Sequence, residues 1–137
     1  MLREGQQKRW IEAGPIGDEL DILAINGKRE IVCVELKHKS NSDLYYGPFQ
    51  AAVYRDAFVA AASSIAADME RLARQKMALG LLPAAAAPLL AIARPIAVRA
   101  MLIVVGQPSK EVMRRLEQSL DSCTGVECLI LPDGDTR

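Results

Sequence analysis

Two apolar runs lie close together near the start of the chain, and both carry charged residues at defined positions. Their content of Val, Ile and Leu predicts strands over 19–25 and 30–37. The short polar connection between them predicts an antiparallel hairpin. Side chains two residues apart on a strand share a face, so Glu35 and Lys37 project together. An acid and a lysine at the end of such an apolar strand are costly to bury unless they have a purpose.

The length of the hairpin loop decides whether Asp21 can reach Glu35. A two-residue turn would place Asp18 opposite Glu35 and would turn Asp21 to the other face of the sheet. A loop over 26–30 places Asp21 directly opposite Glu35, and a three-residue loop keeps it on the same face but further along. A site that contains both acids therefore requires an odd-numbered loop or a bulge. Asp18 and Glu19 remain as fallback ligands.

The rest of the chain predicts an α/β fold with a small mixed β-sheet flanked by helices. The predicted elements after the hairpin are a helix over 48–80, a Pro- and Ala-rich connector over 81–95, a strand over 96–105, a helix capped by Ser109 that ends near 122, and a strand over 126–131. The order is β-β-α-β-α-β. Strands that are separated by helices favour parallel pairing, whereas the hairpin is antiparallel.

The size and composition of the chain limit its class. A length of 137 residues predicts a single domain over 1–137, with a polar N-terminal segment over 1–16. Seventeen basic and 17 acidic residues balance, which argues weakly against a bulk polyanion binder but allows a local basic patch. Three cysteines without a nearby histidine do not suggest zinc. With no signal peptide or membrane span in the pattern, we expect a cytoplasmic protein with no membrane partner.

A set of polar residues occurs in a fixed order on the predicted elements: Asp21, then Glu35-Leu36-Lys37, then Gln50-Ala-Ala-Val-Tyr54. This order resembles the PD-(D/E)xK phosphodiesterase superfamily, the restriction-endonuclease-like nucleases. The helical part looks like the Gln-x-x-x-Tyr motif of RecB-type exonuclease domains. The resemblance covers roughly residues 15–60. It implies a restriction-endonuclease-like core whose N-terminal helix is short or missing, and Glu4 and Glu12 are the only acids upstream of Asp18.

The resemblance implies a metal-dependent nuclease that hydrolyses DNA phosphodiester bonds with Mg²⁺ or Mn²⁺. Asp21, Glu35 and the backbone carbonyl of Leu36 would hold the metal, which prefers oxygen ligands. Lys37 would position or deprotonate the attacking water and offset negative charge in the transition state.

The same resemblance gives roles to the residues that follow the strand. Gln50 and Tyr54, four apart on one helical face, would orient the metal-site residues or the substrate backbone. A basic and aromatic group could contact phosphates and stack on bases, and it consists of His38, Lys39, Tyr45 and Tyr46. Since the chain has no length for a separate recognition domain, a homodimer or a recognition partner is expected.

Two other interpretations fit the same residues. The chain could be a catalytically inactive protein of the nuclease fold that serves as a DNA-binding or structural subunit. It could also be an unrelated α/β interaction module in which Glu35 and Lys37 form a surface ion pair of little energetic value. DNA and RNA, and endonuclease and exonuclease action, are equally compatible with the pattern. The lone histidine, His38, argues against a Ser-His-Asp triad.

Overall fold

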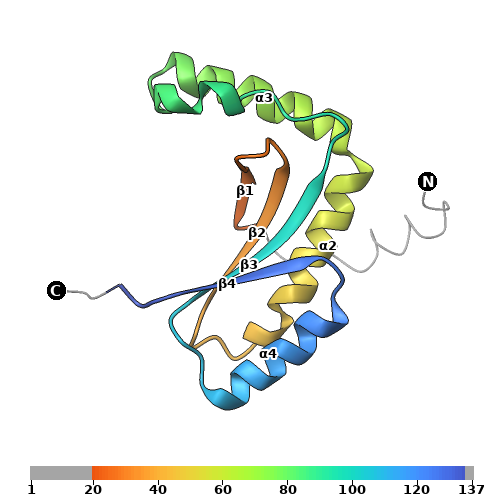
Figure 1. Cartoon of the computed structure of the whole chain (residues 1–137), viewed down its shortest axis with the longest axis vertical. Coiled ribbons are helices and arrows are strands. Elements are labelled where there is room, and N and C mark those ends of the chain that lie inside the picture. The colour runs from red at the N-terminus through yellow and green to blue at the C-terminus, as the bar shows by residue number, and fades with distance from the viewer. Residues whose placement is uncertain (1–19, 135–137) are drawn as a thin grey trace.

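The computed structural model describes residues 20–134, in which a central sheet has its helices arranged around it (Figure 1). Besides the three α-helices of this range there are two short 3₁₀ helices, one between β2 and α2 and one between α3 and β3. The elements are β1 (Ile22–Ile25), β2 (Ile31–His38), η1 (Leu44–Tyr46), α2 (Gly47–Ala60), α3 (Ala62–Ala78), η2 (Ala84–Leu89), β3 (Val98–Val105), α4 (Lys110–Ser122) and β4 (Val126–Leu131).

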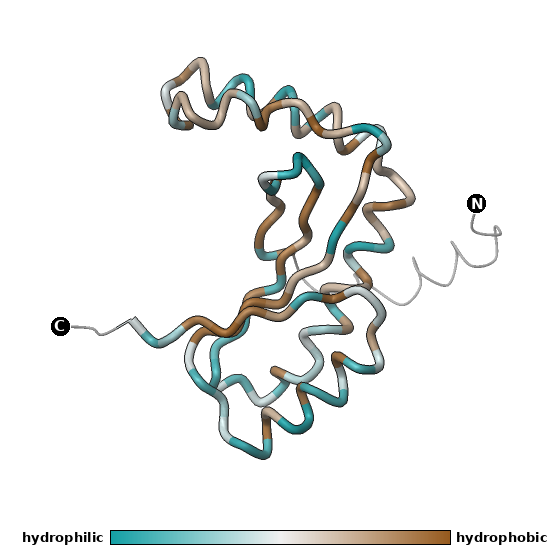
Figure 2. The backbone as a smooth tube through the Cα atoms, in the orientation of Figure 1, coloured by the Kyte–Doolittle hydropathy of each residue, from teal (hydrophilic) through white to brown (hydrophobic). Residues whose placement is uncertain are grey.

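The four strands form one sheet in the order β1-β2-β3-β4. The β1–β2 pair is antiparallel, and β3 runs parallel to both β2 and β4. The prediction of an α/β class with a small mixed sheet is therefore confirmed. Figure 2 shows that the hydrophobic residues are concentrated on the strands, whereas α4 alternates between hydrophobic and hydrophilic residues. Within residues 20–134, none of the helices has the length and apolar character needed to cross a membrane.

The long helix predicted over 48–80 is wrong in one respect, because the structure divides it into α2 and α3 at Ala61. The break lets α3 pass across the end of the β1–β2 hairpin (Figure 1). There Ala66 is buried with Ile31 and Ile92 in a small apolar cluster. The connector over 81–95 includes η2, and the amide of Ile92 donates to Glu70 Oε1 at 2.8 Å.

The main core lies between β3, η1 and α4. Leu44, Leu102, Val104 and Leu116 are almost fully buried there. The amphipathic stripe predicted on α4 packs against this cluster, and Ser109 accepts a hydrogen bond from the Val112 amide as the expected N-cap. The sequence signals for α4 are therefore confirmed.

A glycine brings the start of α2 close to the sheet. A Cβ on Gly47 would lie 2.7 Å from Leu102 Cδ1, closer than side chains tolerate. Gly47 and Pro48 are both buried in the first turn of α2, together with Ala51. This close approach places the next turn of α2 over the carboxyl end of β2, where the candidate site lies.

All three cysteines are free thiols. Cys33 and Cys123 are buried, and burial raises the pKa of the Cys33 thiol to about 11. A thiol with a raised pKa is a poor nucleophile and a poor metal ligand. Cys33 therefore serves as a small apolar residue of β2.

Candidate active site

The hairpin has the register that brings Asp21 next to Glu35. Ile22 pairs with Val34 and Ile25 pairs with Ile31, so the connection is the loop over 26–30. The side chain of Asn26 accepts hydrogen bonds from the amides of Lys28 and Glu30, and Arg29 adopts a left-handed φ of 62°. These contacts stabilise a longer loop than the two-residue turn that Asn26-Gly27 usually forms.

Asp21 lies in a bend immediately before β1 and not on the strand, which corrects the predicted strand start. Its Oδ2 accepts a hydrogen bond from the backbone amide of Leu36 at 2.7 Å. The carboxylate thereby takes the place of the next backbone acceptor of β1 and fixes Asp21 beside the end of β2. The two fallback ligands, Asp18 and Glu19, lie outside the described residues, as do the upstream acids Glu4 and Glu12.

Glu35 and Lys37 form a buried ion pair on the face of β2 that α2 covers. Only 4% of Glu35 and 9% of Lys37 are exposed, and Lys37 Nζ lies 3.1 Å from Glu35 Oε1. Their parallel partners on β3 are the buried residues Leu102 and Val104, so both charges lie next to the core. The predicted common face of Glu35 and Lys37 is confirmed.

The second oxygen of Glu35 has no partner. Oε2 is buried and makes no hydrogen bond. Burial raises the pKa of the Glu35 carboxyl above its ordinary value, and the carboxylates of Asp21 and Asp43 raise it further, whereas Lys37 opposes the shift. The residue is thus a buried carboxyl with one oxygen open to a further ligand.

Asp43 is a member of the site that the sequence reasoning missed. Its Oδ2 lies 3.9 Å from Lys37 Nζ, and it directly precedes η1. Its position in the loop that follows the Glu-x-Lys strand was the available signal, because loops at the carboxyl ends of strands often carry functional residues. Lys37 thus lies between two carboxylates.

Gln50 and Tyr54 lie one turn apart on α2, and both are half-buried. Gln50 Oε1 is buried without a hydrogen bond. Within residues 20–134 the only buried side-chain oxygens or nitrogens that lack a partner are Gln50 Oε1 and Glu35 Oε2. Both belong to residues that the sequence pattern singled out. Buried polar groups are usually satisfied by protein, water or a bound ion, so these two oxygens are available to such a partner.

The donor set suits a hard cation with few protein ligands. Among residues 20–134 no three His, Cys, Asp or Glu side chains are grouped to hold a metal. Magnesium, however, is commonly held by one or two carboxylates and completes its shell with waters and substrate phosphate. Asp21, the open Oε2 of Glu35 and the Leu36 carbonyl fit that requirement, although one oxygen of Asp21 already accepts the Leu36 amide.

The predicted basic group does not form one patch. His38 is exposed at the end of β2, and its Nδ1 lies 2.7 Å from Ser40 Oγ. Lys39 forms an ion pair with Asp133, and the Lys39 ammonium lowers the pKa of that carboxyl. The positive charge of Lys39 is therefore partly neutralised. His38 follows Lys37 on the strand and so projects to the opposite face of the sheet.

Tyr45 and Tyr46 are the last two residues of η1, which begins directly after Asp43. Their ring centroids are 4.6 Å apart at an interplanar angle of 37°. The guanidinium of Arg115, from α4, lies 5.7 Å from the centroid of the Tyr45 ring. Nothing local in the sequence links Arg115 to a tyrosine 70 positions earlier, so this contact could not be predicted.

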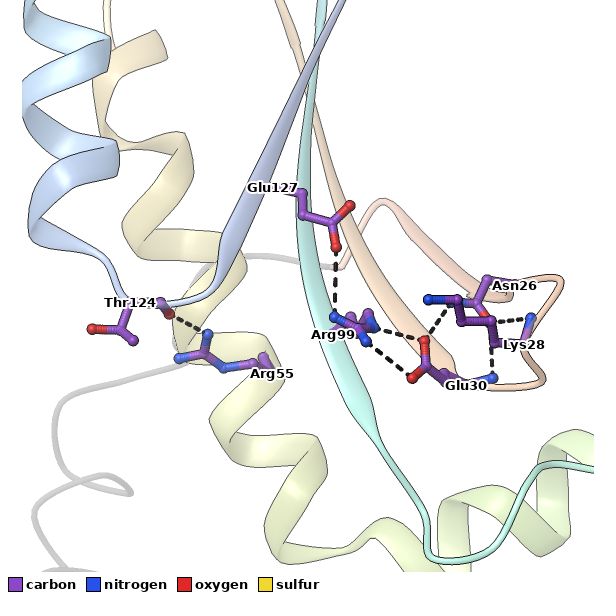
Figure 3. Close-up of polar contacts among 7 residues, drawn as sticks. All are labelled: Asn26, Lys28, Glu30, Arg55, Arg99, Thr124 and Glu127. Carbon is purple, nitrogen blue, oxygen red and sulfur yellow. Dashed lines mark hydrogen bonds and ion pairs between the residues drawn. The ribbon is translucent and has the colours of Figure 1, made fainter.

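A second polar cluster lies at the opposite end of β2, where Glu30 precedes the strand (Figure 3). Arg99 Nε and Nη2 donate to the two oxygens of Glu30 at 2.6 and 3.1 Å, and Asn26 Nδ2 donates at 2.8 Å. Glu127 lies 3.7 Å from Arg99 on the next strand. These hydrogen bonds lower the pKa of Glu30 to about 2.

Comparison of the chain with protein-family models, with curated protein sequences and with solved structures finds no match.

Proposed function

We propose that the protein is a metal-dependent nuclease that hydrolyses DNA phosphodiester bonds. The observation that carries the proposal is the buried, unpartnered Oε2 of Glu35 in a pair with Lys37 and next to Asp21. An uncompensated buried carboxylate oxygen costs free energy unless something binds it. A divalent cation would satisfy it.

Three groups would hold the cation, namely Asp21, Glu35 and the Leu36 backbone carbonyl. When bound, Mg²⁺ or Mn²⁺ supplies Lewis-acid activation of the scissile phosphate and of a water molecule. Lys37 holds its ammonium next to Glu35 and Asp43, where it can orient the attacking water and offset the charge that develops on phosphate. Gln50 on α2 would orient the substrate backbone or the metal-site residues, with Tyr54 one turn further along.

The order of elements supports a restriction-endonuclease-like core as part of the proposal. An antiparallel hairpin followed by parallel strands with intervening helices matches the β-β-α-β-α-β order that the motif residues imply. A homodimer or a separate recognition partner belongs to the same proposal, because residues 20–134 build one sheet with its helices and no second unit. A reducing, cytoplasmic location is consistent with three free thiols.

The test is cleavage of linear, circular and branched DNA in the presence of Mg²⁺ or Mn²⁺, with wild type beside Lys37→Ala. The proposal expects metal-dependent products with wild type and none with the variant. Equal product formation by both proteins would assign the cleavage to a contaminant or to another site. The three DNA forms also distinguish endonuclease action, which opens circles, from action at ends.

A catalytically inactive DNA-binding protein of the same fold is the second candidate. The observation that favours it is the hydrogen bond from the Leu36 amide to Asp21 Oδ2, which gives that carboxylate a structural role without a metal. Such a protein would bind DNA equally well with and without divalent cations and would not cleave it. Binding that is measured in EDTA and in manganese separates the two candidates.

A further inference from the structure

The two neighbouring tyrosines of η1 follow Asp43 within one turn, and their ring planes are tilted by 37°. Tyr46 donates its amide to the carbonyl of Asp43 at 2.9 Å, so the rings begin within one turn of the acid that lies near Lys37. Tyr46 is 53% exposed. A half-exposed aromatic side chain in the turn after Asp43 offers a flat surface to a ligand.

The turn that carries the rings is held firmly by the core. Leu44, the first residue of η1, is fully buried with Leu102 and Leu116. The orientation of Tyr45 and Tyr46 is thus set by a buried anchor and by packing of η1 against α4. A surface that is already ordered loses little conformational entropy when a ligand stacks on it.

A guanidinium group from α4 lies beside the rings. Arg114 and Arg115 both pair with the single carboxylate of Glu111, each at 3.1 Å, so one acid serves two guanidinium groups. Arg115 also lies over the Tyr45 ring. Its exposed half can therefore add a cation–π contribution and an attraction for phosphate.

We propose that Tyr45, Tyr46 and Arg115 form a stacking surface for an unpaired base, and that the substrate is a single-stranded nucleic acid or a strand end with unpaired bases. This inference rests on the proposed function, because it places the stacked base beside Asp43 and Lys37. A base inside a duplex is already stacked on both sides, whereas an unpaired base has a free face for an aromatic ring. Stacking is tolerant of sequence, so no base-specific contact is required.

The experiment measures binding in EDTA, without cleavage, in a Glu35→Ala background. The probes are a fluorescently labelled single-stranded DNA of about 15 nucleotides, in the range of a single-strand binding groove, and the same sequence as a blunt duplex. Tyr46→Ala should weaken single-strand binding by about 5- to 100-fold, the usual effect of losing one stacked base. Duplex binding should not change.

Tyr46→Phe is the matched control for Tyr46→Ala, and Arg114→Ala is the matched control for Arg115→Ala. Tyr46→Phe keeps the ring and should bind like the parent. Arg115→Ala should weaken single-strand binding, whereas Arg114→Ala should weaken it less, because Arg114 shares Glu111 but is not stacked on a ring among residues 20–134. Because Tyr46 is half-exposed, thermal melting of each variant should stay close to that of the parent.

The result that overturns the stacking surface is equal single-strand affinity for the parent and for Tyr46→Ala, or an equal loss for duplex and single strand. This readout does not depend on cleavage. If wild type fails to cut DNA while Tyr46→Ala still loses single-strand binding, the nuclease proposal fails and the stacking surface stands. If wild type cuts single-stranded and duplex DNA equally and Tyr46→Ala changes neither activity, the nuclease proposal stands and the stacking surface fails.

Discussion

Two glutamates near opposite ends of β2 differ in how many hydrogen bonds and ion pairs the chain gives to their carboxylates. Glu30, just before β2, has both oxygens bonded by Arg99 and a further bond from Asn26, which lower its pKa to about 2. Glu35, five residues later, has one oxygen paired with Lys37 and the other buried without a partner, and its pKa is raised. Of the two, only Glu30 has hydrogen bonds from the chain to both of its carboxylate oxygens.

The difference separates a structural ion pair from a candidate reaction centre. A carboxylate whose two oxygens are both hydrogen-bonded by the chain contributes to the fold and needs no further ligand. A carboxylate that is left incomplete costs stability, and such costs are concentrated at functional sites. Glu30 therefore provides a matched internal control for every test of Glu35.

The largest expected effect is on cleavage. Lys37→Ala and Glu35→Ala should each lower the rate of DNA hydrolysis by about 100-fold or more, because each removes a group that acts on the developing charge or holds the metal. Glu30→Gln should keep the wild-type rate within a factor of about two. A change of that size corresponds to far less than the roughly 1.36 kcal/mol of activation free energy that a tenfold change in rate requires. Single-turnover rates with a labelled oligonucleotide in manganese provide the measurement. A comparable loss in Glu30→Gln would remove the distinction between the two acids.

The next effect is stabilisation by metal. Manganese at 100 times its dissociation constant should stabilise wild type by about 2.7 kcal/mol, as mass action requires for a ligand of the native state alone. Glu35→Gln should show no such gain, and Glu30→Gln should behave like wild type. Thermal melting with and without manganese measures the difference. Equal stabilisation of all three proteins would place the bound metal elsewhere.

A smaller effect is expected from pH in the absence of metal. The pKa of Glu35 is raised in the folded state, so folding binds a proton there, and the contribution of this group is greatest below its unfolded value of 4.5. Stability should fall as the pH rises from 4.5 through the raised pKa. Glu35→Gln should remove this fall, although it also removes the charged partner of the buried Lys37 ammonium. Melting temperatures in EDTA against pH would show parallel curves for the two proteins if Glu35 were not perturbed.

The smallest effect is expected at Glu30, which is partly buried, and its sign is opposite. The pKa of Glu30 falls from 4.5 to about 2 on folding, so its contribution is complete above 4.5 and is lost as the pH drops through about 2. Glu30→Gln should remove this acid-dependent part and lower the stability at neutral pH, where the contribution of Glu30 is complete. Acid titration of the unfolding transition gives the comparison, and an unchanged acid limb in the variant would show that Arg99 does not perturb Glu30.

The elements with strong local signals could be predicted from the sequence. Ser109 as an N-cap and the apolar stripe on α4 placed that helix correctly, and the short strand predicted over 126–131 coincides with β4. The break at Ala61 could not be predicted, because Ala favours helix on both sides of it and no Gly or Pro marks the position. It is imposed by the packing of α3 across the hairpin.

Strand periodicity predicted only those parts of the candidate site that lie on β2. Alternation on β2 placed Glu35 and Lys37 on one face, but the position of Asp21 depended on the loop. That loop is fixed by Asn26 side-chain bonds and by a left-handed Arg29, which residue identities alone do not dictate. Asp43 joins the site through a turn of the chain after β2, which periodicity does not describe.

The most direct measurement is anomalous diffraction at the manganese edge from crystals soaked in the metal. A manganese-dependent nuclease centre predicts a peak about 2.0–2.3 Å from Glu35 Oε2, with Asp21 and the Leu36 carbonyl in the same shell. A peak that vanishes in Glu35→Gln crystals and persists in Glu30→Gln crystals would complete the comparison. Saturating manganese with no peak between Asp21 and Glu35, and a water on Glu35 Oε2 instead, would contradict it.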